Sequence, residues 1–327
     1  MNKKYNVLIT RELIEGSYDL LKNDCNLEIH PHNRPMKREE LEESIKDKDG
    51  LLTMLTESID RELIELNPDL KIIANCAVGY DNIDIEACNE YNIKVSNTPD
   101  ILTNTTADYA WAMLMSLSRN IVKADKNLRG NGFSGWSLMD FLGTDIYKKT
   151  LGIIGLGRIG QAVAKRAQGF DMRIIYNDIN RSNELEDELN IEYSNFDNLI
   201  SESDFIIIFV PLLESTRHLI GEKELKSMKK TSFLINIARG GIVDEKALEK
   251  ALKNNEIAGA ALDVYEGEPD VSEGLKKLDN VILTPHIASA SKTTRYKMAE
   301  VAAKNLLSGL KNQEVENIVN PEVLQKG

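Results

Sequence analysis

The feature that most constrains the fold of this chain is a glycine-rich stretch near its centre, TLGIIGLGRIG, from Thr150 to Gly160. Its spacing is G-x-G-x-x-G: Gly155 permits a tight turn, Gly157 lets the backbone approach a pyrophosphate, and Gly160 lets a helix pack closely on a strand. The first amides of such a helix face an anion. Alone, the triplet indicates a nucleotide site only weakly, because glycine-rich turns are common.

The residues on both sides of the triplet strengthen this interpretation. An apolar run, Leu151–Ile154, predicts a buried strand before it, and residues 161–166 predict a helix after it. A second strand, Met172–Asn177, ends at Asp178, about 20 residues on, where a carboxylate can bind the ribose hydroxyls of a dinucleotide and repel a 2′-phosphate. The sequence therefore predicts NAD, although nearby Arg181 could soften the choice against NADP; a purely structural strand-turn-helix is the alternative.

The composition excludes several classes of protein. A chain of 327 residues favours two domains, and a net charge of −12 argues against binding to nucleic acid or to anionic membranes. The first apolar run is too short for a secretion signal, and no stretch approaches the roughly 18 apolar residues of a membrane span. Cys25, Cys76 and Cys88 have neither metal nor redox spacing, so we expect a cytoplasmic protein. His30 and His32 lack further ligands nearby, and no metal site is predicted.

Strand and helix patterns alternate along the chain. Strands are predicted at Asn6–Thr10, Leu27–His30, Asp49–Thr53, Leu70–Asn75, Ile93–Ser96, Asp204–Val210, Ser232–Ile237, Gly259–Val264 and Asn280–Thr284, and helices at Glu12–Lys22, Lys37–Ile45, Asp60–Leu66, Lys246–Asn254 and Thr293–Leu310. This alternation is typical of parallel βαβ units. The predicted fold class is α/β, with a Rossmann-type doubly wound parallel sheet for the cofactor and a smaller flavodoxin-like α/β substrate domain.

The predicted domain boundaries lie near residues 100 and 286. Asn97-Thr98-Pro99-Asp100 ends the first strand-helix series, since a residue before proline is disfavoured in a helix. We therefore expect residues 1–100 to begin the substrate (catalytic) domain, residues 101–286 to form the NAD-binding domain, and residues 287–327 to return and complete the first. One long helix is expected from Thr103 or Thr105 to Lys126. The irregular, aromatic-rich residues 130–143 after it predict an oligomer, a homodimer.

Candidate chemical groups follow three of the predicted strands. Ligands of open parallel sheets bind outside the carboxyl ends of the strands. Arg239 follows one strand, Glu266 and Glu268 follow the next, and His286 follows the last. A histidine can give a proton to the alkoxide formed by hydride reduction, a carboxylate can fix its tautomer, and an arginine can hold a substrate carboxylate. Singly, Arg239 could be an ion-pair partner and His286 a turn-stabilising ring.

Several stretches match one known family in order and spacing. They are VGYDNID (Val78–Asp84), NTPD (Asn97–Asp100), GLGRIG (Gly155–Gly160), NIARGGIVDE (Asn236–Glu245), LDVYEGEP (Leu262–Pro269) and TPHIAS (Thr284–Ser289). Through them, over nearly its whole length, the chain resembles the D-isomer-specific 2-hydroxyacid dehydrogenases, and within that family the glyoxylate and hydroxypyruvate reductases.

The resemblance implies roles for particular residues. Arg239 would bind and polarise the substrate, His286 would donate or accept the proton, and Glu268 would pair with His286. The substrate would be bound by Leu55, Val78, Gly79, Arg239 and His286, with the amides of Val78 and Gly79 on its carboxylate. The cofactor would be bound by Thr106, Gly155, Gly157, Arg158, Ile159, Gly160, Asp178, Val210, Ile237, Ala238, Asp263 and His286.

The resemblance also reduces the number of candidate substrates. Similar 3-phosphoglycerate dehydrogenases carry arginines where this chain has Met54 and Asn75, and a formate dehydrogenase would have glutamine in place of Glu268. Small 2-oxo acids such as glyoxylate and hydroxypyruvate are therefore favoured. A D-lactate or D-3-phosphoglycerate dehydrogenase remains an alternative, and so does a non-catalytic protein of the same fold that senses NADH.

Overall fold

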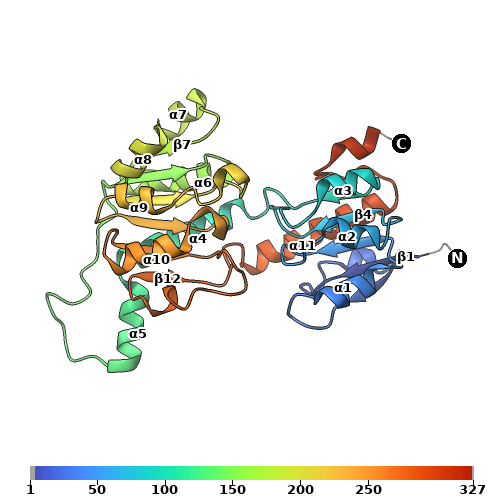
Figure 1. Cartoon of the computed structure of the whole chain (residues 1–327), viewed down its shortest axis with the longest axis horizontal. Coiled ribbons are helices and arrows are strands. Elements are labelled where there is room, and N and C mark those ends of the chain that lie inside the picture. Colours follow the sequence, from blue (N-terminus) through green and yellow to red (C-terminus); the bar gives the residue numbers. More distant parts are fainter. Residues whose placement is uncertain (1–3, 326–327) are drawn as a thin grey trace. The chain divides into compact units, whose positions relative to one another are not determined.

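The computed structural model describes residues 4–325, and the chain divides into two compact units. Unit 1 contains the chain up to Leu102 and again from Ala290, and unit 2 contains Thr103–Ser289. Figure 1 shows that each unit is a sheet with helices on both faces. Unit 2 is thus an insertion in the sequence of unit 1.

Unit 1 is built on a five-stranded parallel sheet with the order β2-β1-β3-β4-β5. Its strands are β1 (Tyr5–Ile9), β2 (Cys25–Ile29), β3 (Gly50–Thr53), β4 (Ile72–Asn75) and β5 (Lys94–Ser96). Every residue of β3 and β4 is buried, as expected of central strands covered on both faces.

Two apolar layers cover the faces of this sheet. One face packs on α1 (Arg38–Ile45), α2 (Arg61–Glu65) and α3 (Ile85–Glu90), and the other on η1 (Asp19–Leu21) and α11 (Lys292–Leu310). The helix starts are fixed locally, since Asp60, Asp84 and Ser291 each accept a backbone N–H of the first turn. The short η6 (Pro321–Gln325) ends the described chain.

Unit 2 is built on a seven-stranded parallel sheet with the order β12-β11-β10-β9-β6-β7-β8. Its strands are β6 (Thr150–Ile154), β7 (Arg173–Asn177), β8 (Glu192–Tyr193), β9 (Phe205–Ile208), β10 (Phe233–Asn236), β11 (Gly259–Leu262) and β12 (Val281–Leu283). The chain runs outward from β6 to β8 and returns beside β6 at β9. The direction of strand addition therefore reverses between β6 and β9, which is where open α/β sheets bind ligands.

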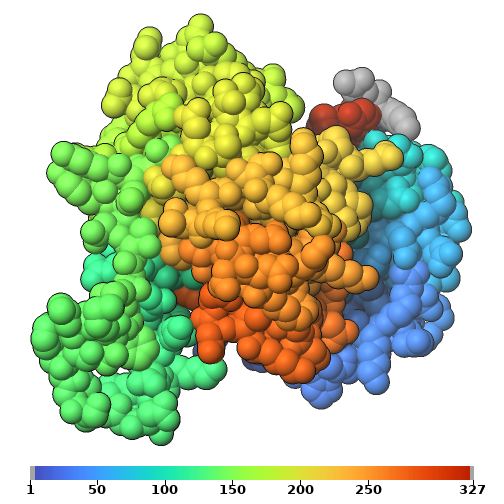
Figure 2. All heavy atoms as spheres, turned by 60° about the vertical axis from the view of Figure 1, so that its left-hand side comes forward, coloured from blue at the N-terminus to red at the C-terminus, as the bar shows by residue number. Residues whose placement is uncertain are grey.

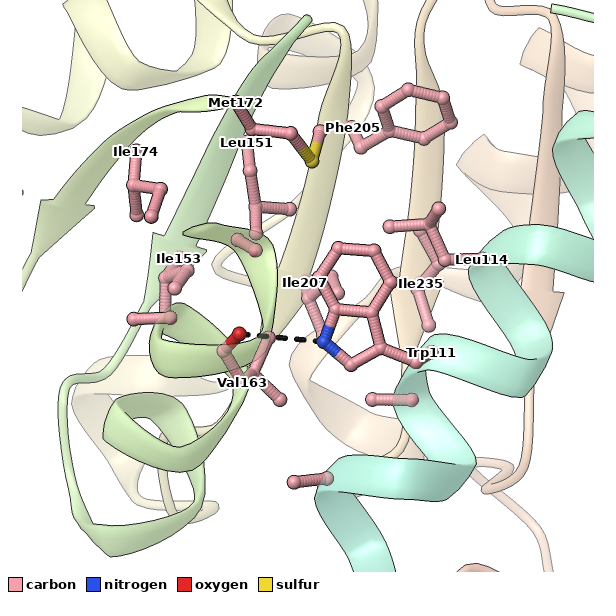
Figure 3. Packing of buried hydrophobic residues seen from close by; sticks show 14 of the residues in the cluster. Trp111, Leu114, Leu151, Ile153, Val163, Met172, Ile174, Phe205, Ile207 and Ile235 are labelled. Carbon is pink, nitrogen blue, oxygen red and sulfur yellow. Dashed lines mark hydrogen bonds between the residues drawn. The ribbon is translucent and has the colours of Figure 1, made fainter. Parts of the chain in front are cut away.

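Helices flank both faces of this sheet as well. The helices of unit 2 are α4 (Thr103–Ser118), α5 (Ile121–Asn131), α6 (Arg158–Ala167), α7 (Asn183–Leu189), α8 (Phe196–Glu202), α9 (Glu222–Ser227) and α10 (Glu245–Lys253), with short turns η2 (Gln168–Phe170), η3 (Glu214–Thr216), η4 (Gly240–Ile242) and η5 (Leu275–Lys277). The helices α4 and α6 pack on one face, and α8, α9 and α10 on the other. In Figure 3, Trp111 of α4 lies in the first of these layers, and its indole N–H donates to the carbonyl of Val163 over 3.3 Å.

The predicted helix at Glu12–Lys22 is wrong. The segment is a series of turns in which only η1 is helical. Gly16 has a φ of +86°, and Ser17 uses both its amide and its hydroxyl on the carbonyl of Ile14. The ring of Tyr296 on α11 lies close to Gly16, so packing on a distant helix decides this turn.

The predicted single helix from residue 103 to Lys126 is also wrong. It is divided into α4 and α5 at Asn120, whose φ is +55°. The later chain causes the break: the amide of Thr144 donates to the carbonyl of Ser118, and the Asn120 side chain donates to the carbonyl of Leu142. After α5 the chain is irregular, as predicted, up to the strand β6.

Candidate functional site

The glycine-rich turn between β6 and α6 has the geometry that its sequence predicts. Gly155 has a φ of +94°, which favours glycine. A side chain at Gly160 would overlap the carbonyl of Gly155, so glycine there lets α6 pack against the turn. A side chain at Gly157 would meet nothing within 4 Å, which leaves the start of α6 open to a ligand. The turn is thus shaped as a cradle for an anionic group.

Asp178 lies beside this turn, at the end of β7. Its Oδ2 accepts the amide of Leu156 over 2.7 Å, and its Oδ1 accepts the amide of Asn180 over 3.0 Å. Each carboxylate oxygen retains a lone pair for a further donor. Arg181 is paired elsewhere, since its guanidinium makes two 2.9 Å hydrogen bonds to Glu186. Asp178 can therefore take two hydroxyl donors next to the glycine turn.

His286 and Glu268 form a hydrogen-bonded pair at the other half of the same sheet edge. They follow β12 and β11, and His286 Nδ1 lies 2.9 Å from Glu268 Oε2. An ionised carboxylate only accepts hydrogen bonds, so Nδ1 carries the proton and Nε2 is the nitrogen available for proton exchange. Both side chains are partly exposed, His286 by 25% and Glu268 by 30%, so a substrate can reach them.

The surroundings of Glu268 favour its charged form. Burial alone would raise the pKa of Glu268, but the hydrogen bond and charge of His286, the amide of Tyr265 and the charge of Arg239 together hold that pKa below its ordinary value. The Tyr265 amide donates to Glu268 Oε1 over 3.0 Å. Glu268 is thus an anion that can orient His286 and stabilise its cation.

Arg239 follows β10 in a turn shaped by Asn236. The Asn236 side chain donates to the carbonyl of Arg239 over 2.9 Å and accepts the amide of Ala238 over 3.1 Å. The next residue, Gly240, is so close to the backbone of Tyr265 that any side chain would overlap it. This close approach joins the turn that carries Arg239 to the loop that carries Glu268.

Asp263 is buried completely, and its hydrogen bonds hold the loop of His286. Its Oδ1 accepts the amide of Ile287 and its Oδ2 that of Ala288, over 2.9 and 2.8 Å, while its carbonyl accepts the amide of His286 over 2.9 Å. His286 itself has a φ of +52°, a conformation that few residues adopt without such support. In this structure Asp263 fixes the loop that carries the histidine.

The remaining predicted cofactor residues lie around the same sheet edge of unit 2. Thr106 is buried in the first turns of α4, Val210 follows β9 with its side chain against Gly155, and Ile237 and Ala238 follow β10. Arg158 and Ile159 open α6, directly after Gly157. The structure thus places the predicted cofactor residues and the predicted trio of Arg239, Glu268 and His286 within one unit.

The predicted substrate residues Leu55, Val78 and Gly79 lie in unit 1. Leu55 is in the turn after β3, and Val78 and Gly79 are in the turn after β4, so they share the carboxyl edge of that sheet. All three are partly exposed. The polar side chains that support these turns, Asn75 and Asn97, lie within the matching stretches or beside them, but their roles could not be read from spacing.

Sequence reasoning also missed two hydroxyls that hold Asp263. The Thr284 hydroxyl donates to Asp263 Oδ1 over 2.8 Å, and Tyr109 of α4 donates to Thr284 over 2.7 Å. Thr284 directly precedes Pro285 and His286 in a matched stretch, which was a usable signal. Tyr109 lies about midway along a helix far away in the sequence, and nothing in its spacing marks it.

Comparison with known proteins identifies the family. The model of the D-isomer specific 2-hydroxyacid dehydrogenase, NAD binding domain, matches residues 111–288. A glyoxylate reductase of Pyrococcus horikoshii is 50% identical over 326 residues, which cover 98% of each chain. The crystal structure of a glyoxylate reductase from Paecilomyes thermophila has a TM-score of 0.86 at 34% identity, covering 97% of this chain and 98% of that one.

Another structural relative was solved with a cofactor. It is the NADPH-dependent glyoxylate/hydroxypyruvate reductase of Sinorhizobium meliloti in complex with NADP and malonate, with a TM-score of 0.82, 30% identity and 98% of both chains covered. The chain belongs to the D-isomer specific 2-hydroxyacid dehydrogenase family. It is an oxidoreductase that acts on the CH–OH group of 2-hydroxy acids and has a nicotinamide-dinucleotide-binding domain.

Proposed function

We propose that this protein reduces small 2-oxo acids, glyoxylate and hydroxypyruvate, with NADH, and that His286 is the acid and base of the reaction. The single observation that carries the proposal is the 2.9 Å pair of His286 Nδ1 and Glu268 Oε2 beside Arg239, on a sheet edge that also holds the glycine turn. Relatives that are 43% to 50% identical over almost the whole chain are glyoxylate reductases, which favours this substrate class.

The residues of the trio divide the work in this proposal. A bound NADH supplies the hydride for C2 of the 2-oxo acid. His286 gives its Nε2 proton to the oxygen that becomes the hydroxyl, and Glu268 stabilises the protonated ring through Nδ1. Arg239 binds the substrate carboxylate or the polarised carbonyl with a charge that persists at any physiological pH. The amides of Val78 and Gly79 in unit 1 hold the substrate carboxylate.

The geometry at Asp178 supports NADH over NADPH. Both of its oxygens have a lone pair left for the two ribose hydroxyls, whereas a 2′-phosphate would meet a carboxylate. Arg181, which could attract that phosphate, is held by Glu186, and its guanidinium lies 5.3 Å from the ring centroid of Tyr193. The hydrogen bond from Arg181 keeps the pKa of Glu186 below its ordinary value, so the pair stays charged.

The substrate turns of unit 1 suit an acid with a small uncharged tail. Asn75 is fully buried and bonded to the carbonyl of Gly79, and Met54 is apolar. One cation of this region, Arg11, lies 3.5 Å from the buried carboxylate of Glu57, which offsets its charge. Met54 and Asn75 themselves offer no charge to a phosphate, which disfavours the D-3-phosphoglycerate alternative; a D-lactate dehydrogenase would differ only in substrate preference.

The test is an assay of purified protein with NADH and a panel of 2-oxo acids. We expect loss of NADH absorbance with glyoxylate and hydroxypyruvate, slower loss with pyruvate and little with 3-phosphohydroxypyruvate. If the protein bound NADH but oxidised none of it with any member of the panel, a non-catalytic NADH sensor would be the better description.

We also propose a homodimer. The residues from α5 to β6 expose large apolar side chains: Phe133 by 78%, Trp136 by 83%, Leu138 by 70% and Met139 by 71%. In Figure 2 this segment stands out in green from the body of unit 2. Several large apolar side chains exposed in one segment are usually covered by a partner, and a second copy of the chain is the simplest one.

Light scattering tests the dimer. The wild type should have twice the chain mass of 36.7 kDa, and Trp136→Asp should shift it toward the monomer. Leu66→Asp is the matched control, because Leu66 is an exposed leucine of unit 1, 41% accessible and far from this segment in the sequence. A monomeric wild type, or a Trp136→Asp variant of unchanged mass, would refute the proposal.

The cellular location is a proposal as well. The thiols of Cys25, Cys76 and Cys88 are unpaired, and burial raises the pKa of Cys25 to about 11 and those of the other two to about 12, so they are poorly reactive. Together with the use of NADH, this favours the cytoplasm. Among the residues that the structure describes, no helix is both long and apolar enough to cross a membrane.

A further inference from the structure

The turn after β4 in unit 1 has three consecutive carbonyl groups that are held by other groups. The carbonyl of Ala77 accepts the amide of Thr98 over 2.9 Å, and that of Val78 accepts the side-chain amide of Asn97 over 2.8 Å. The carbonyl of Gly79 accepts the side-chain amide of Asn75 over 2.8 Å. Two of these three donors thus come from asparagine side chains, and Asn97 and Thr98 are adjacent in the sequence.

Fixing a carbonyl also fixes the direction of the next amide. A trans peptide is planar, and the C=O of one residue points opposite to the N–H of the next. Asn75, Asn97 and Thr98 lie on the carbonyl side of these three peptides. The N–H groups of Val78, Gly79 and Tyr80 therefore point to the opposite side. Within residues 4–325, these three N–H groups have no hydrogen-bond acceptor. Tyr80 is 43% exposed, so the turn is open to solvent.

We propose that Asn97 and Asn75 are positioning residues for the substrate carboxylate. They do not touch the substrate; each holds one carbonyl of the turn and thereby aims an amide N–H at the carboxylate of the 2-oxo acid. Asn97 fixes the direction of the Gly79 N–H, and Asn75 fixes the direction of the Tyr80 N–H. The inference rests on the proposed function, because it assumes that this turn receives the carboxylate.

The burial of Asn75 supports this role. Its side chain is completely buried, and its Oδ1 has no hydrogen-bond partner among the described residues. Leaving a buried acceptor unpaired is destabilising, so an apolar residue would serve the stability of the sheet better. An asparagine here is explained by what its Nδ2 holds, the carbonyl of Gly79.

A third asparagine ties this turn to the turn of Leu55. Asn82 donates to the carbonyls of Met54 and Glu57, over 3.0 and 2.9 Å. Glu57 also holds that turn, since its Oε2 accepts the amide of Met54 and the hydroxyl of Thr10, both over 3.1 Å. The two substrate turns of unit 1 are thus held as one piece, so the aim of the amides is fixed relative to Leu55.

The experiment compares Asn97→Ala and Asn97→Asp with the wild type, with NADH as the coenzyme. In Asn97→Asp the side chain keeps its shape, but an oxygen then faces the carbonyl of Val78 and repels it. We expect kcat/KM for glyoxylate to fall by about 10- to 100-fold in both variants, mainly through KM, because misplacing a positioned group by a fraction of an ångström has effects of this size. The affinity for NADH, which binds unit 2, should stay unchanged. Weaker inhibition by oxalate, a two-carbon dianion, should accompany the loss.

Asn67→Ala is the matched control. Asn67 is a buried asparagine of unit 1 whose side chain donates to the carbonyls of Ile45 and Lys48 over 2.8 Å each, but it lies before β4, whereas Asn97 directly follows β5. It should lower the thermal midpoint of unfolding as Asn97→Ala does and leave the KM for glyoxylate unchanged.

The outcomes separate this inference from the proposed function. If the wild type reduces glyoxylate and Asn97→Asp has the same KM, the side chain only fills space and the inference is wrong. A wild type that reduces no 2-oxo acid overturns the proposed function. Calorimetry of oxalate binding to the NADH-loaded protein then decides the inference: weaker binding by both Asn97 variants supports it, and equal binding refutes it.

Discussion

The carboxyl edges of the two parallel sheets differ in where their functional groups reside. In unit 2 the edge carries side chains that hold or move charge: Arg239, Asp263, Glu268 and His286 follow three successive strands. In unit 1 the corresponding edge presents backbone amides, and asparagine side chains hold them in place. In the proposed function, the same architecture serves proton transfer in one unit and neutral recognition of an anion in the other.

This difference has a physical reason. Proton transfer needs a group with a suitable pKa, which only a side chain supplies, whereas a carboxylate can be bound by backbone N–H groups with no charge nearby. Changes in unit 2 should therefore affect rate, and changes in unit 1 should affect substrate affinity.

The substitution His286→Ala should have the largest effect and tests whether proton transfer belongs to unit 2. If proton transfer resides in unit 2, kcat for glyoxylate reduction should fall by about two to four orders of magnitude, the usual size of a general acid contribution. The affinity for NADH, measured by fluorescence, should change little. A loss of NADH binding in place of a loss of rate would mean that His286 is structural.

His218→Ala is the matched control for this prediction. His218 also pairs with a glutamate, Glu266, over 2.9 Å, and lies in the same unit. Among the described residues, His286 forms its ion pair with Glu268 and not with Glu266, so the control should keep a rate close to that of the wild type. A comparable loss of rate in both variants would contradict the assignment of His286 as the acid and base.

Glu268→Gln should have the next largest effect. It removes the negative charge beside Nδ1, and kcat should fall by about 10- to 100-fold, a size found when the carboxylate partner of a functional histidine is removed.

The same substitution tests the pH dependence of stability. Because the folded pKa of Glu268 lies below the ordinary 4.5, its pairing stabilises the fold above that pH, and the contribution is lost as the pH falls through the folded value. The difference in thermal midpoint between the wild type and Glu268→Gln should therefore shrink below about pH 4.5. A difference that stays constant down to acid denaturation would contradict the assignment.

Asp178→Ser sharpens the comparison within unit 2. Without the carboxylate, the 2′-phosphate is no longer repelled, so the ratio of NADPH to NADH activity should rise by about tenfold, which corresponds to roughly 1.4 kcal/mol. Arg181→Ala is the control and should change the ratio less, because that guanidinium is already paired with Glu186. Kinetics with both coenzymes measure the ratio; an unchanged ratio in Asp178→Ser would remove its role.

The sequence nominated the candidate residues of unit 2 more directly than those of unit 1, for the same physical reason. An arginine or a histidine directly after a strand of a parallel sheet points to a ligand site. Residue type and position were therefore enough to nominate Arg239 and His286. In our proposal the turn of Val78 and Gly79 binds the substrate through backbone amides. Residue types do not reveal such amides, and only the resemblance to a family marked this turn. Asn97 appeared only as part of a domain boundary and of a matching stretch, because its bond to Val78 depends on how β4 and β5 end side by side.

The fold was predictable wherever burial alone decides it. The apolar runs of β3, β4 and β9 are strands because every residue in them is buried. The two errors, at residues 12–22 and at Asn120, have one cause in common: a positive φ supported by a segment distant in the sequence, Tyr296 in one case and residues 142–144 in the other. Periodicity within a window cannot contain such partners.

The nesting of unit 2 inside unit 1 has a consequence for synthesis on the ribosome. One face of the first sheet is covered by Ala302, Ala303, Leu306 and Leu310 of α11, which are translated only after the whole of unit 2. The first segment of unit 1 therefore keeps an apolar face uncovered during translation, whereas unit 2 can already acquire its native packing. The helix α11, which is made after all of unit 2, thus completes the sheet that is made before unit 2.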